Sequence, residues 1–430
     1  MKNLKNPEVI GRERVLLLGA GIFIAANHIG LVIAANRSPL DLWLLALWTI
    51  CAVTGSFALD RLNPLRDPYI FPATMLLTGW GLNLIDRLLP AYNVRQAGWM
   101  VLGLLALLVI CALPGHLRWL RSYRYTWLLG GLALLAVTIL LGVNPSGEGP
   151  QLWLGLDGLY FQPSEFLKVL LVVFLASYMA DHQHVFRREK FRMLERYPSW
   201  RFMGPVFLMW GISLVLLIWQ RDLGTAAIFF LIFTLMLYLA SGQFWLLGGG
   251  LLLMMVGAAG AYMVFDIVAL RVDIWLDPWR EPEGRSFQIV QSLMAIADGG
   301  LVGSGIGQGI PTFIPVVHTD FAYAAIVEEW GLLGAVGLMS ALLVIILRGL
   351  RIAALLHHRP FHAFLAAGLC ITLTVQSLII ISGALNLIPL TGVTLPFVSY
   401  GGSSLLTSFV MVGLLLALSR EAHLSMDTPE

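Results

Sequence analysis

A short stretch of the chain, WLDPWREPEGRSFQ at 275–288, gathers charged and turn-forming residues between long apolar runs. Its charged side chains are Asp277, Arg280, Glu281, Glu283 and Arg285. The prolines and the glycine between them stiffen the segment and hold these side chains in place. A carboxylate held above a lipid-accessible groove can act as a general base for chemistry on a lipid-linked substrate. The alternative interpretation is a solvated cluster of charges.

A second polar group opens an apolar run in QPSEFLKVLL, residues 162–171. Pro163 and Ser164 are typical of a helix start. Glu165 and Lys168 are three residues apart, so they share one face of that helix. An ammonium group here either snorkels to the membrane surface or points with its partner into a polar cavity. We favour the cavity.

Two more groups of ionisable residues stand at the ends of apolar runs. In WQRDLGT, Asp222 can cap the helix that follows, and the bland alternative is a plain turn between helices. In HTDFAYAAIVEEWG, His318 and Asp320 precede a run that carries two adjacent glutamates at 328–329. Neighbouring carboxylates in an apolar helix are costly unless they are paired or protonated. A structural pairing with another helix is as good an interpretation as a direct role.

A cluster of small and hydroxyl residues opens the last apolar run, in GVTLPFVSYGGSSLL at 392–406. Ser399, Gly401 and Gly402 can allow close packing of helices. They can also expose backbone N–H groups at a helix start to an anionic ligand such as a phosphate. The glycine-rich run at 299–309 follows no strand and has no Lys-Ser/Thr pair, so it predicts turns and not a nucleotide loop.

The composition identifies an integral membrane protein. Of 430 residues, 58% are hydrophobic and 12% are charged, whereas soluble domains carry about a quarter charged residues. A net charge of only +2 gives no strong positive electrostatic field to attract nucleic acid, so we exclude nucleic acid as a partner. The three cysteines lie in apolar stretches without the spacing of a disulfide framework or a zinc site. The basic N-terminus is interpreted as a retained anchor and not as a cleaved signal peptide.

Runs of roughly 17–25 apolar residues predict about twelve membrane-spanning helices and hence an all-α polytopic fold. The predicted spans are 15–35, 41–59, 69–89, 97–113, 125–143, 164–180, 203–219, 224–240, 244–265, 321–348, 361–384 and 403–419. Lys and Arg concentrate in alternate connections, including the N-terminus and the loop at 187–201, which predicts that both termini are cytoplasmic. The long segment at 266–320 then faces outward. Within it, 286–300 predicts an amphipathic helix at the outer leaflet.

Five motifs occur in an order that resembles the SEDS family, the RodA, FtsW and SpoVE polymerases of bacterial peptidoglycan. They are QPSE with a following Lys at 162–168, QRDLGT at 220–225, SFQIVQS with ADGGLVGSGIGQG, HTDF with EEWG at 318–331, and PFVSYGGSS at 396–404. The resemblance covers residues 151–430, which we expect to form a catalytic membrane core. Residues 1–150 are expected to form a separate N-terminal group of about five helices.

The resemblance implies a glycosyltransferase of the bacterial cytoplasmic membrane that polymerises lipid II at the outer face. Its usual partner is a class B penicillin-binding protein, a transpeptidase. The acceptor hydroxyl attacks the anomeric carbon of the donor sugar and displaces undecaprenyl pyrophosphate with inversion. Matched to the family motif, Glu281 is the catalytic base, and the remaining site residues bind the substrate: Glu165, Lys168, Asp222, Arg280, His318, Asp320, Ser399, Gly401 and Gly402. No cofactor is certain, and a divalent cation, Mg²⁺ or Mn²⁺, beside the pyrophosphate is a hypothesis.

The sequence departs from the family pattern at two of these motifs. Glu281 stands where the family has Asp, and Asp277 is a nearby fallback. Arg221 stands where the family usually has Pro. Two other functions stay open, because a carboxylate misplaced by about 1 Å can cost 100-fold in rate and because charges inside a helical bundle also mark translocation paths. One is a lipid II flippase or transporter, and the other is a non-catalytic scaffold for a penicillin-binding protein. A Glu281 that faces Lys168 across one cavity would favour the enzyme.

Overall fold

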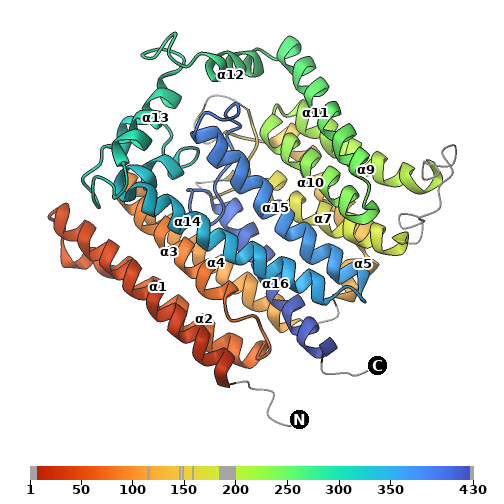
Figure 1. Ribbon diagram of the computed structural model, residues 1–430, viewed down its shortest axis with the longest axis horizontal. Coiled ribbons are helices and arrows are strands. Elements are labelled where there is room, and N and C mark those ends of the chain that lie inside the picture. Colours follow the sequence, from red (N-terminus) through yellow and green to blue (C-terminus); the bar gives the residue numbers. More distant parts are fainter. Residues whose placement is uncertain are drawn as a thin grey trace.

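The fold is a bundle of long helices with one elaborate loop region (Figure 1). The computed structural model describes residues 7–113, 117–144, 147, 150–156, 159–183 and 200–426. Its helices are α1 (Pro7–Ala34), α2 (Trp43–Leu62), α3 (Ile70–Leu88), α4 (Asn93–Ala112), α5 (Arg118–Ser122), α6 (Arg124–Leu141), α7 (Pro163–Asp181), α9 (Trp200–Trp219), α10 (Leu223–Ser241), α11 (Phe244–Val264), α12 (Asp266–Leu276), α13 (Phe287–Gly299), α14 (Ala322–Leu355), α15 (Pro360–Ala384) and α16 (Gly402–Met426). Short 3-10 helices are η1 (Pro39–Leu42), η2 (Pro90–Tyr92) and η3 (Pro311–Phe313).

Every apolar segment predicted to span the membrane coincides with a helix, so the all-α polytopic fold is confirmed. The count of twelve spans is not confirmed. Among the described residues, ten helices are long and apolar enough to cross a membrane. α3 is not one of them, because Asn83, Asp86 and Arg87 interrupt its apolar character. The described apolar part of α9, Gly204–Trp219, is shorter than the ten.

Helix boundaries follow local signals in the sequence. α7 begins with Pro163 in its first turn, where a missing N–H costs nothing. α10 begins after Asp222, whose carboxylate accepts a hydrogen bond of 3.2 Å from the backbone N–H of Thr225. α10 ends at Gly242, which has a left-handed backbone with φ +67°. Asp222 is therefore a helix cap, as predicted.

The helices alternate in direction, which divides the molecule into two ends. The loop end carries α12, α13, η3, the hairpin of residues 154–156 and 159–161 and the connection 385–401, and the opposite end, called the termini end, carries the start of α1, the end of α16 and α5 (Figure 1). Ion pairs at the termini end link helices to neighbouring connections, Arg348 of α14 to Asp67 and Glu421 of α16 to Arg359. The start of α1 and the end of α16 thus lie on one side of the bundle, as the predicted topology requires.

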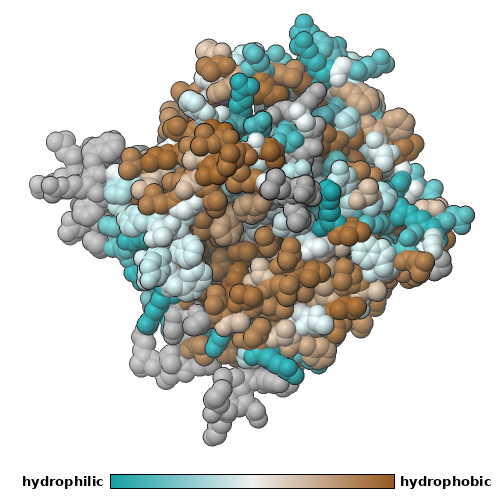
Figure 2. Space-filling model, turned by 180° about the vertical axis from the view of Figure 1, so that it is seen from behind, coloured by the Kyte–Doolittle hydropathy of each residue, from teal (hydrophilic) through white to brown (hydrophobic). Residues whose placement is uncertain are grey.

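The burial pattern is that of a protein surrounded by lipid. α7, α15 and α16 are mostly buried, whereas no residue of α11 is buried. Broad hydrophobic areas cover the rear face of the molecule (Figure 2). Exposed apolar side chains are expected on such a surface, because lipid tails are as apolar as the side chains themselves.

The predicted amphipathic helix at 286–300 is present as α13. Its buried side includes Ile289, Val290 and Ala295 and packs on α14. The hydroxyl of Ser292 donates a 3.0 Å hydrogen bond to the carbonyl of Ala384 in α15. Helices of the bundle therefore cover the buried face of α13, and its position at the outer leaflet stays a prediction.

The glycine-rich run after α13 forms turns, as predicted, and these turns fill a break in α14. The break is at Gly331, which has φ +61° and ψ −160°. The backbone N–H groups of Ser304 and Gly305 donate to the carbonyls of Glu328 and Glu329, over 2.9 and 3.1 Å. The N–H of Leu332 donates to the carbonyl of Gly300 over 2.9 Å. The turns therefore satisfy backbone groups that the broken helix leaves unpaired.

A small antiparallel hairpin of β1 (Leu154–Leu156) and β2 (Leu159–Phe161) precedes α7. The sequence analysis did not predict it. It ends directly before Gln162, whose backbone N–H donates to the hydroxyl of Ser403 over 2.8 Å. The hairpin thus brings the start of α7 against the start of α16.

Candidate active site

A buried lysine lies at the centre of the candidate site. The Nζ atom of Lys168 donates to both carboxylate oxygens of Glu165 over 2.8 Å and to Oε1 of Gln376 over 2.7 Å. The side chains of Lys168 and Glu165 are only 1% and 7% exposed. Lys168 therefore points into the bundle and does not snorkel. A buried pair of this kind is tolerated when further hydrogen bonds satisfy both charges.

Gln376 of α15 links this pair to the loop end. Its amide nitrogen donates to the carbonyl of Thr394 over 2.8 Å. The hydroxyl of Thr394 donates to that of Ser404 at the start of α16 over 2.7 Å. Sequence analysis missed Gln376, although its carboxamide in the apolar α15 is a polar group where polar groups are costly. α7, α15 and α16 thus meet in one polar network.

Asp222 extends the network to the start of α10. Its Oδ2 atom accepts a 3.2 Å hydrogen bond from the hydroxyl of Ser164, the residue before Glu165. Asp222 as a whole is 9% exposed. The structure therefore brings together three of the predicted site residues, namely Glu165, Lys168 and Asp222.

Arg271 of α12 is a further cation at this end of the bundle, and the sequence analysis did not single it out. Its Nη1 atom donates to the carbonyl of Thr391 over 3.2 Å, and it interacts electrostatically with Asp320 and Asp222. Burial lowers the pKa of Arg271, and the two carboxylates oppose that shift. Arg271 thus connects α12 to the segment after α15 and stands between two predicted site residues.

Asp320 lies just before α14, and its pKa is raised to about 6. Burial is the main cause, and the hydroxyl of Thr319 and the charge of Arg271 act in the opposite direction. Burial also lowers the pKa of His318, which favours the neutral imidazole. A group that titrates near neutral pH beside a fixed cation is suited to respond to an anionic ligand.

The segment before α16 is held on the residues before α14. The backbone N–H of Tyr400 donates to the carbonyl of His318 over 2.7 Å. The hydroxyl of Ser399 donates to the backbone carbonyl of Thr319 over 2.6 Å. A Cβ atom on Gly402 would lie 2.1 Å from the indole nitrogen of Trp99. Close packing is therefore the structural reason for a glycine at 402. Gly401 lies beside it, with its N–H 3.5 Å from Oε1 of Gln96.

The predicted base, Glu281, lies in the exposed turns between α12 and α13. Its side chain is 52% exposed and lies 3.7 Å from Nε of Arg285, and Arg280 is exposed as well. No hydrogen bond or ion pair within the described residues joins Glu281 to Lys168 or Asp222. The structure thus places Glu281 toward solvent. The turns follow α12, which is anchored by Arg271 and by a 3.2 Å hydrogen bond from Asn386 to the carbonyl of Trp275.

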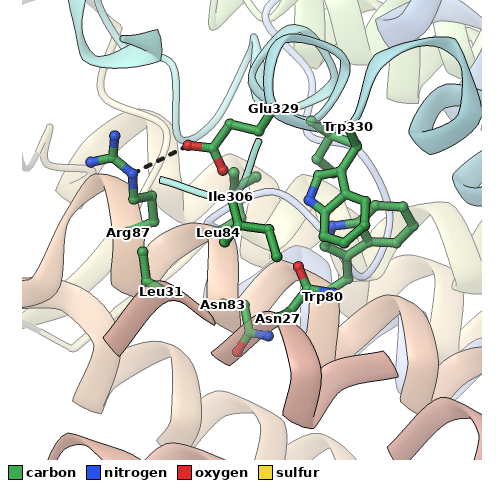
Figure 3. Close-up of a pocket in the computed structure, with 10 residues that line it drawn as sticks. Asn27, Leu31, Trp80, Asn83, Leu84, Arg87, Ile306, Glu329 and Trp330 are labelled. Carbon is green, nitrogen blue, oxygen red and sulfur yellow. Dashed lines mark hydrogen bonds and ion pairs between the residues drawn. The ribbon is translucent and has the colours of Figure 1, made fainter. Parts of the chain in front are cut away.

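The adjacent glutamates of α14 have structural partners. Glu329 accepts from Nε of Arg87 over 3.2 Å, as Figure 3 shows, and Glu328 accepts from the backbone N–H of Ile310 over 2.6 Å. Beside the Arg87 pair is a cavity of about 20 Å³, lined in part by Trp80 and Trp330. That volume holds about one water molecule. The two glutamates are therefore paired structurally with other elements, which is the alternative to a direct role in the reaction. The cavity is too small for a lipid-linked sugar.

The described residues contain no group of three or more His, Cys, Asp and Glu side chains placed to hold a metal ion. Asp222 and Asp320 share the charge of Arg271, so a cation of the protein itself already stands beside these two carboxylates. Dependence on a divalent cation stays a prediction.

Fold and site together define a polytopic helical membrane protein with a buried charged network that reaches its loop end. The family model described as "Cell cycle protein", that of FtsW, RodA and SpoVE, matches residues 84–424. The chain belongs to this family, and the resemblance drawn from its five motifs is confirmed.

Relatives and solved structures agree with that assignment. The chain is 37% identical to "Peptidoglycan glycosyltransferase RodA" of Mycobacterium bovis, over 97% of this chain and 92% of the relative. It is 33% identical to "Probable peptidoglycan glycosyltransferase FtsW" of Geobacter metallireducens, over 76% and 84%. A structure described as "Structural coordination of polymerization and crosslinking by a peptidoglycan synthase complex" matches with a TM-score of 0.68 and 28% identity, over 83% of this chain and 98% of that one. The crystal structure of the rod shape determining protein RodA of Thermus thermophilus, 23% identical with a TM-score of 0.59 over 83% and 98%, shares the fold.

Proposed function

We propose that the protein is a peptidoglycan glycosyltransferase that polymerises lipid II into glycan strands at the outer face of the bacterial cytoplasmic membrane. The observation that carries the proposal is the buried network of Lys168, Glu165 and Gln376. It occurs in a chain 37% identical over 97% of its length to a relative named for this activity. Ionisable residues inside a membrane bundle are costly and usually functional, so such a network is the natural candidate for binding a charged substrate.

In the proposed reaction, Glu281 accepts the proton of the attacking acceptor hydroxyl. The acceptor oxygen forms a bond to the anomeric carbon of the donor sugar as the bond to the pyrophosphate oxygen breaks. Inversion follows from attack on the face opposite the leaving group. The leaving pyrophosphate needs fixed positive charge or backbone donors. Lys168 and Arg280 are proposed to bind it, with Glu165, Asp222, His318, Asp320, Ser399, Gly401 and Gly402 shaping the site.

The exposed position of Glu281 constrains this mechanism. The carboxylate must come over the bound sugar, and its segment is joined to the bundle through α12, which Arg271 ties to Thr391. A turn segment of this kind is suited to closing on a substrate. Arg271 is therefore proposed to set the position from which the segment carrying Glu281 reaches the site.

We propose that both termini are cytoplasmic, which places the loop end outside. The basic residues at 187–196 that support this orientation lie outside the described residues, but Arg118, Arg121, Arg124, Arg348 and Arg351 also lie at the termini end. Residues 151–430 are proposed as the catalytic core, with the helices of 1–150 as a supporting group. The family match already begins within α3.

The proposed partner is a class B penicillin-binding protein. One solved structure similar to this chain is described as a peptidoglycan synthase complex that coordinates polymerisation and crosslinking. A polymerase and a crosslinking enzyme in one complex would act on the same strand.

A second candidate function is that of a scaffold without transferase activity. The observation that favours it is the 52% exposed side chain of Glu281, together with Glu in place of the family Asp. Such a protein would bind its partner and lipid II but form no glycan.

The discriminating experiment is polymerisation of labelled lipid II by the purified protein, alone and with its class B partner. The enzyme predicts glycan chains whose amount rises with the partner. Lipid II binding without chains in both samples would support the scaffold, and movement of lipid II across vesicles without chains would support a flippase.

A further inference from the structure

A second charged hollow lies far from the candidate active site, at the termini end of the bundle. Its lining comprises Arg118, Arg121, Ser122, Arg124, Tyr125 and Asp181, and its volume is about 490 Å³. These residues come from α5, the start of α6 and the end of α7. Volumes of a few hundred Å³ are typical of small-molecule sites. The proposed reaction uses none of these residues.

Asp181 organises two of the arginines. Its Oδ1 atom accepts from Nη2 of Arg121 over 2.6 Å, and its Oδ2 atom accepts from Nη1 of Arg124. Nη1 of Arg124 also donates to the hydroxyl of Ser177 over 3.0 Å and to its carbonyl over 3.3 Å. Each guanidinium has five N–H donors, so these bonds hold the groups in place and leave other donors unused within the described residues.

The lining keeps excess positive charge after this pairing. Asp181 is the one acidic side chain among the six lining residues, against three arginines. Arg118 is exposed and has neither an ion pair nor a side-chain hydrogen bond within the described part of the chain. Guanidinium groups are suited to bind phosphate oxygens, because their N–H donors match the geometry of the phosphate.

The hollow also lies at the end of a helix that is long and apolar enough to cross a membrane. Arg124 is the first residue of an apolar span, Arg124–Leu141. Its guanidinium lies 5.1 Å from the centre of the Tyr125 ring, and the rings of Trp119 and Trp127 are in edge contact at 5.5 Å. Tyr and Trp gather at the level of the lipid headgroups. A phosphate in this hollow would therefore sit where phospholipid headgroups lie.

We propose that this pocket binds a phosphate group, presented by the headgroup of an anionic phospholipid in the leaflet at the termini end. Arg118 and Arg121 supply donors to the phosphate, and Asp181 and Arg124 hold the pocket in shape. The proposal differs from a general attraction of basic residues to the membrane surface, because it assigns binding to one pocket and not to the net charge of that end.

The test uses the full-length protein in detergent, with phosphatidylglycerol or phosphatidylcholine added, and counts retained lipids by native mass spectrometry. The pocket variant is Arg118→Gln with Arg121→Gln. The matched control is Arg61→Gln with Arg351→Gln, two exposed arginines at the same end, which removes the same net charge. We expect wild type and control to retain phosphatidylglycerol over phosphatidylcholine, and the pocket variant to lose at least fivefold in this retention. Equal losses in the two variants would overturn the proposal.

Two additions distinguish the sources of phosphate and guard against misfolding. Inorganic phosphate titrated against the bound lipid should fail to displace it if the headgroup is the ligand. Free phosphate bound at millimolar concentration by wild type but not by the pocket variant, with no phosphatidylglycerol retained by wild type, would assign the pocket to free phosphate and overturn the lipid source. Ser122→Glu adds a negative charge to the lining at an exposed residue, so it should reduce retention without loss of the folded state. Unchanged retention in this variant would contradict the proposal.

Discussion

At the scale of single residues, the Lys168 and Glu165 pair makes a thermodynamic prediction. Lys168→Met leaves a buried carboxylate without its cation, and removing one partner of a buried pair costs roughly 3–5 kcal/mol. Lys168→Met combined with Glu165→Gln removes both charges and should recover most of the thermal stability measured in detergent. Both variants should lose lipid II polymerisation, because the protein then lacks the charged network that is proposed to bind the substrate. A double variant as unstable as the single one would contradict this account.

Asp320 makes a prediction about pH. Its pKa is about 6 in the folded protein against an ordinary value of 3.8, so the folded state holds the proton more tightly. The resulting stabilisation is complete below about pH 3.8 and is lost as pH rises through about 6. It amounts to no more than about 3 kcal/mol, since one pKa unit corresponds to about 1.4 kcal/mol. Thermal midpoints from pH 4 to 7 should therefore fall for wild type relative to Asp320→Asn. Parallel curves would show that Asp320 does not titrate in this range.

At the scale of elements, the broken helix α14 depends on Gly331. A Cβ atom there would lie 2.4 Å from the backbone nitrogen of Gly303, and its φ of +61° disfavours any other residue. Gly331→Ala should lower the free energy of unfolding by roughly 1–3 kcal/mol, because it strains the backbone and displaces the turns that fill the break. Gly337→Ala in the same helix is the control, because its Cβ would meet Trp80 at an ordinary 3.9 Å. The measurement is the midpoint of thermal unfolding in detergent. Equal midpoints for the two variants would contradict the proposed role of the break in α14.

At the scale of the whole molecule, the proposed topology predicts which residues can be labelled from outside the cell. The three natural cysteines are buried, so a single introduced cysteine reports its own position. Glu283→Cys, at the loop end, should react with a membrane-impermeant maleimide in intact cells. His358→Cys, exposed at the termini end, should react only after permeabilisation. The reverse labelling pattern would show that the protein has the opposite orientation in the membrane.

The sequence predicted the helices well because membrane-spanning segments are long, apolar and local. It also predicted that Lys168 points inward, since Glu165 is its neighbour on one helix. It missed the partners that folding brings from afar. Gln376 is 208 residues from Lys168, and Thr391 is 120 residues from Arg271. It predicted α13 as an amphipathic helix but not its contact with α14, because an amphipathic pattern does not say whether lipid or protein covers the apolar face.

The central claim is that this family member is a transferase whose base is Glu281. The most direct measurement is the rate of glycan formation from labelled lipid II by Glu281→Gln, with Glu283→Gln as the matched exposed control. Loss of a general base costs roughly 10²–10⁴-fold in rate, so we predict a loss of that size for Glu281→Gln with lipid II binding intact. Glu283→Gln should keep the wild-type rate. A Glu281→Gln protein that polymerises lipid II as fast as wild type would contradict the claim.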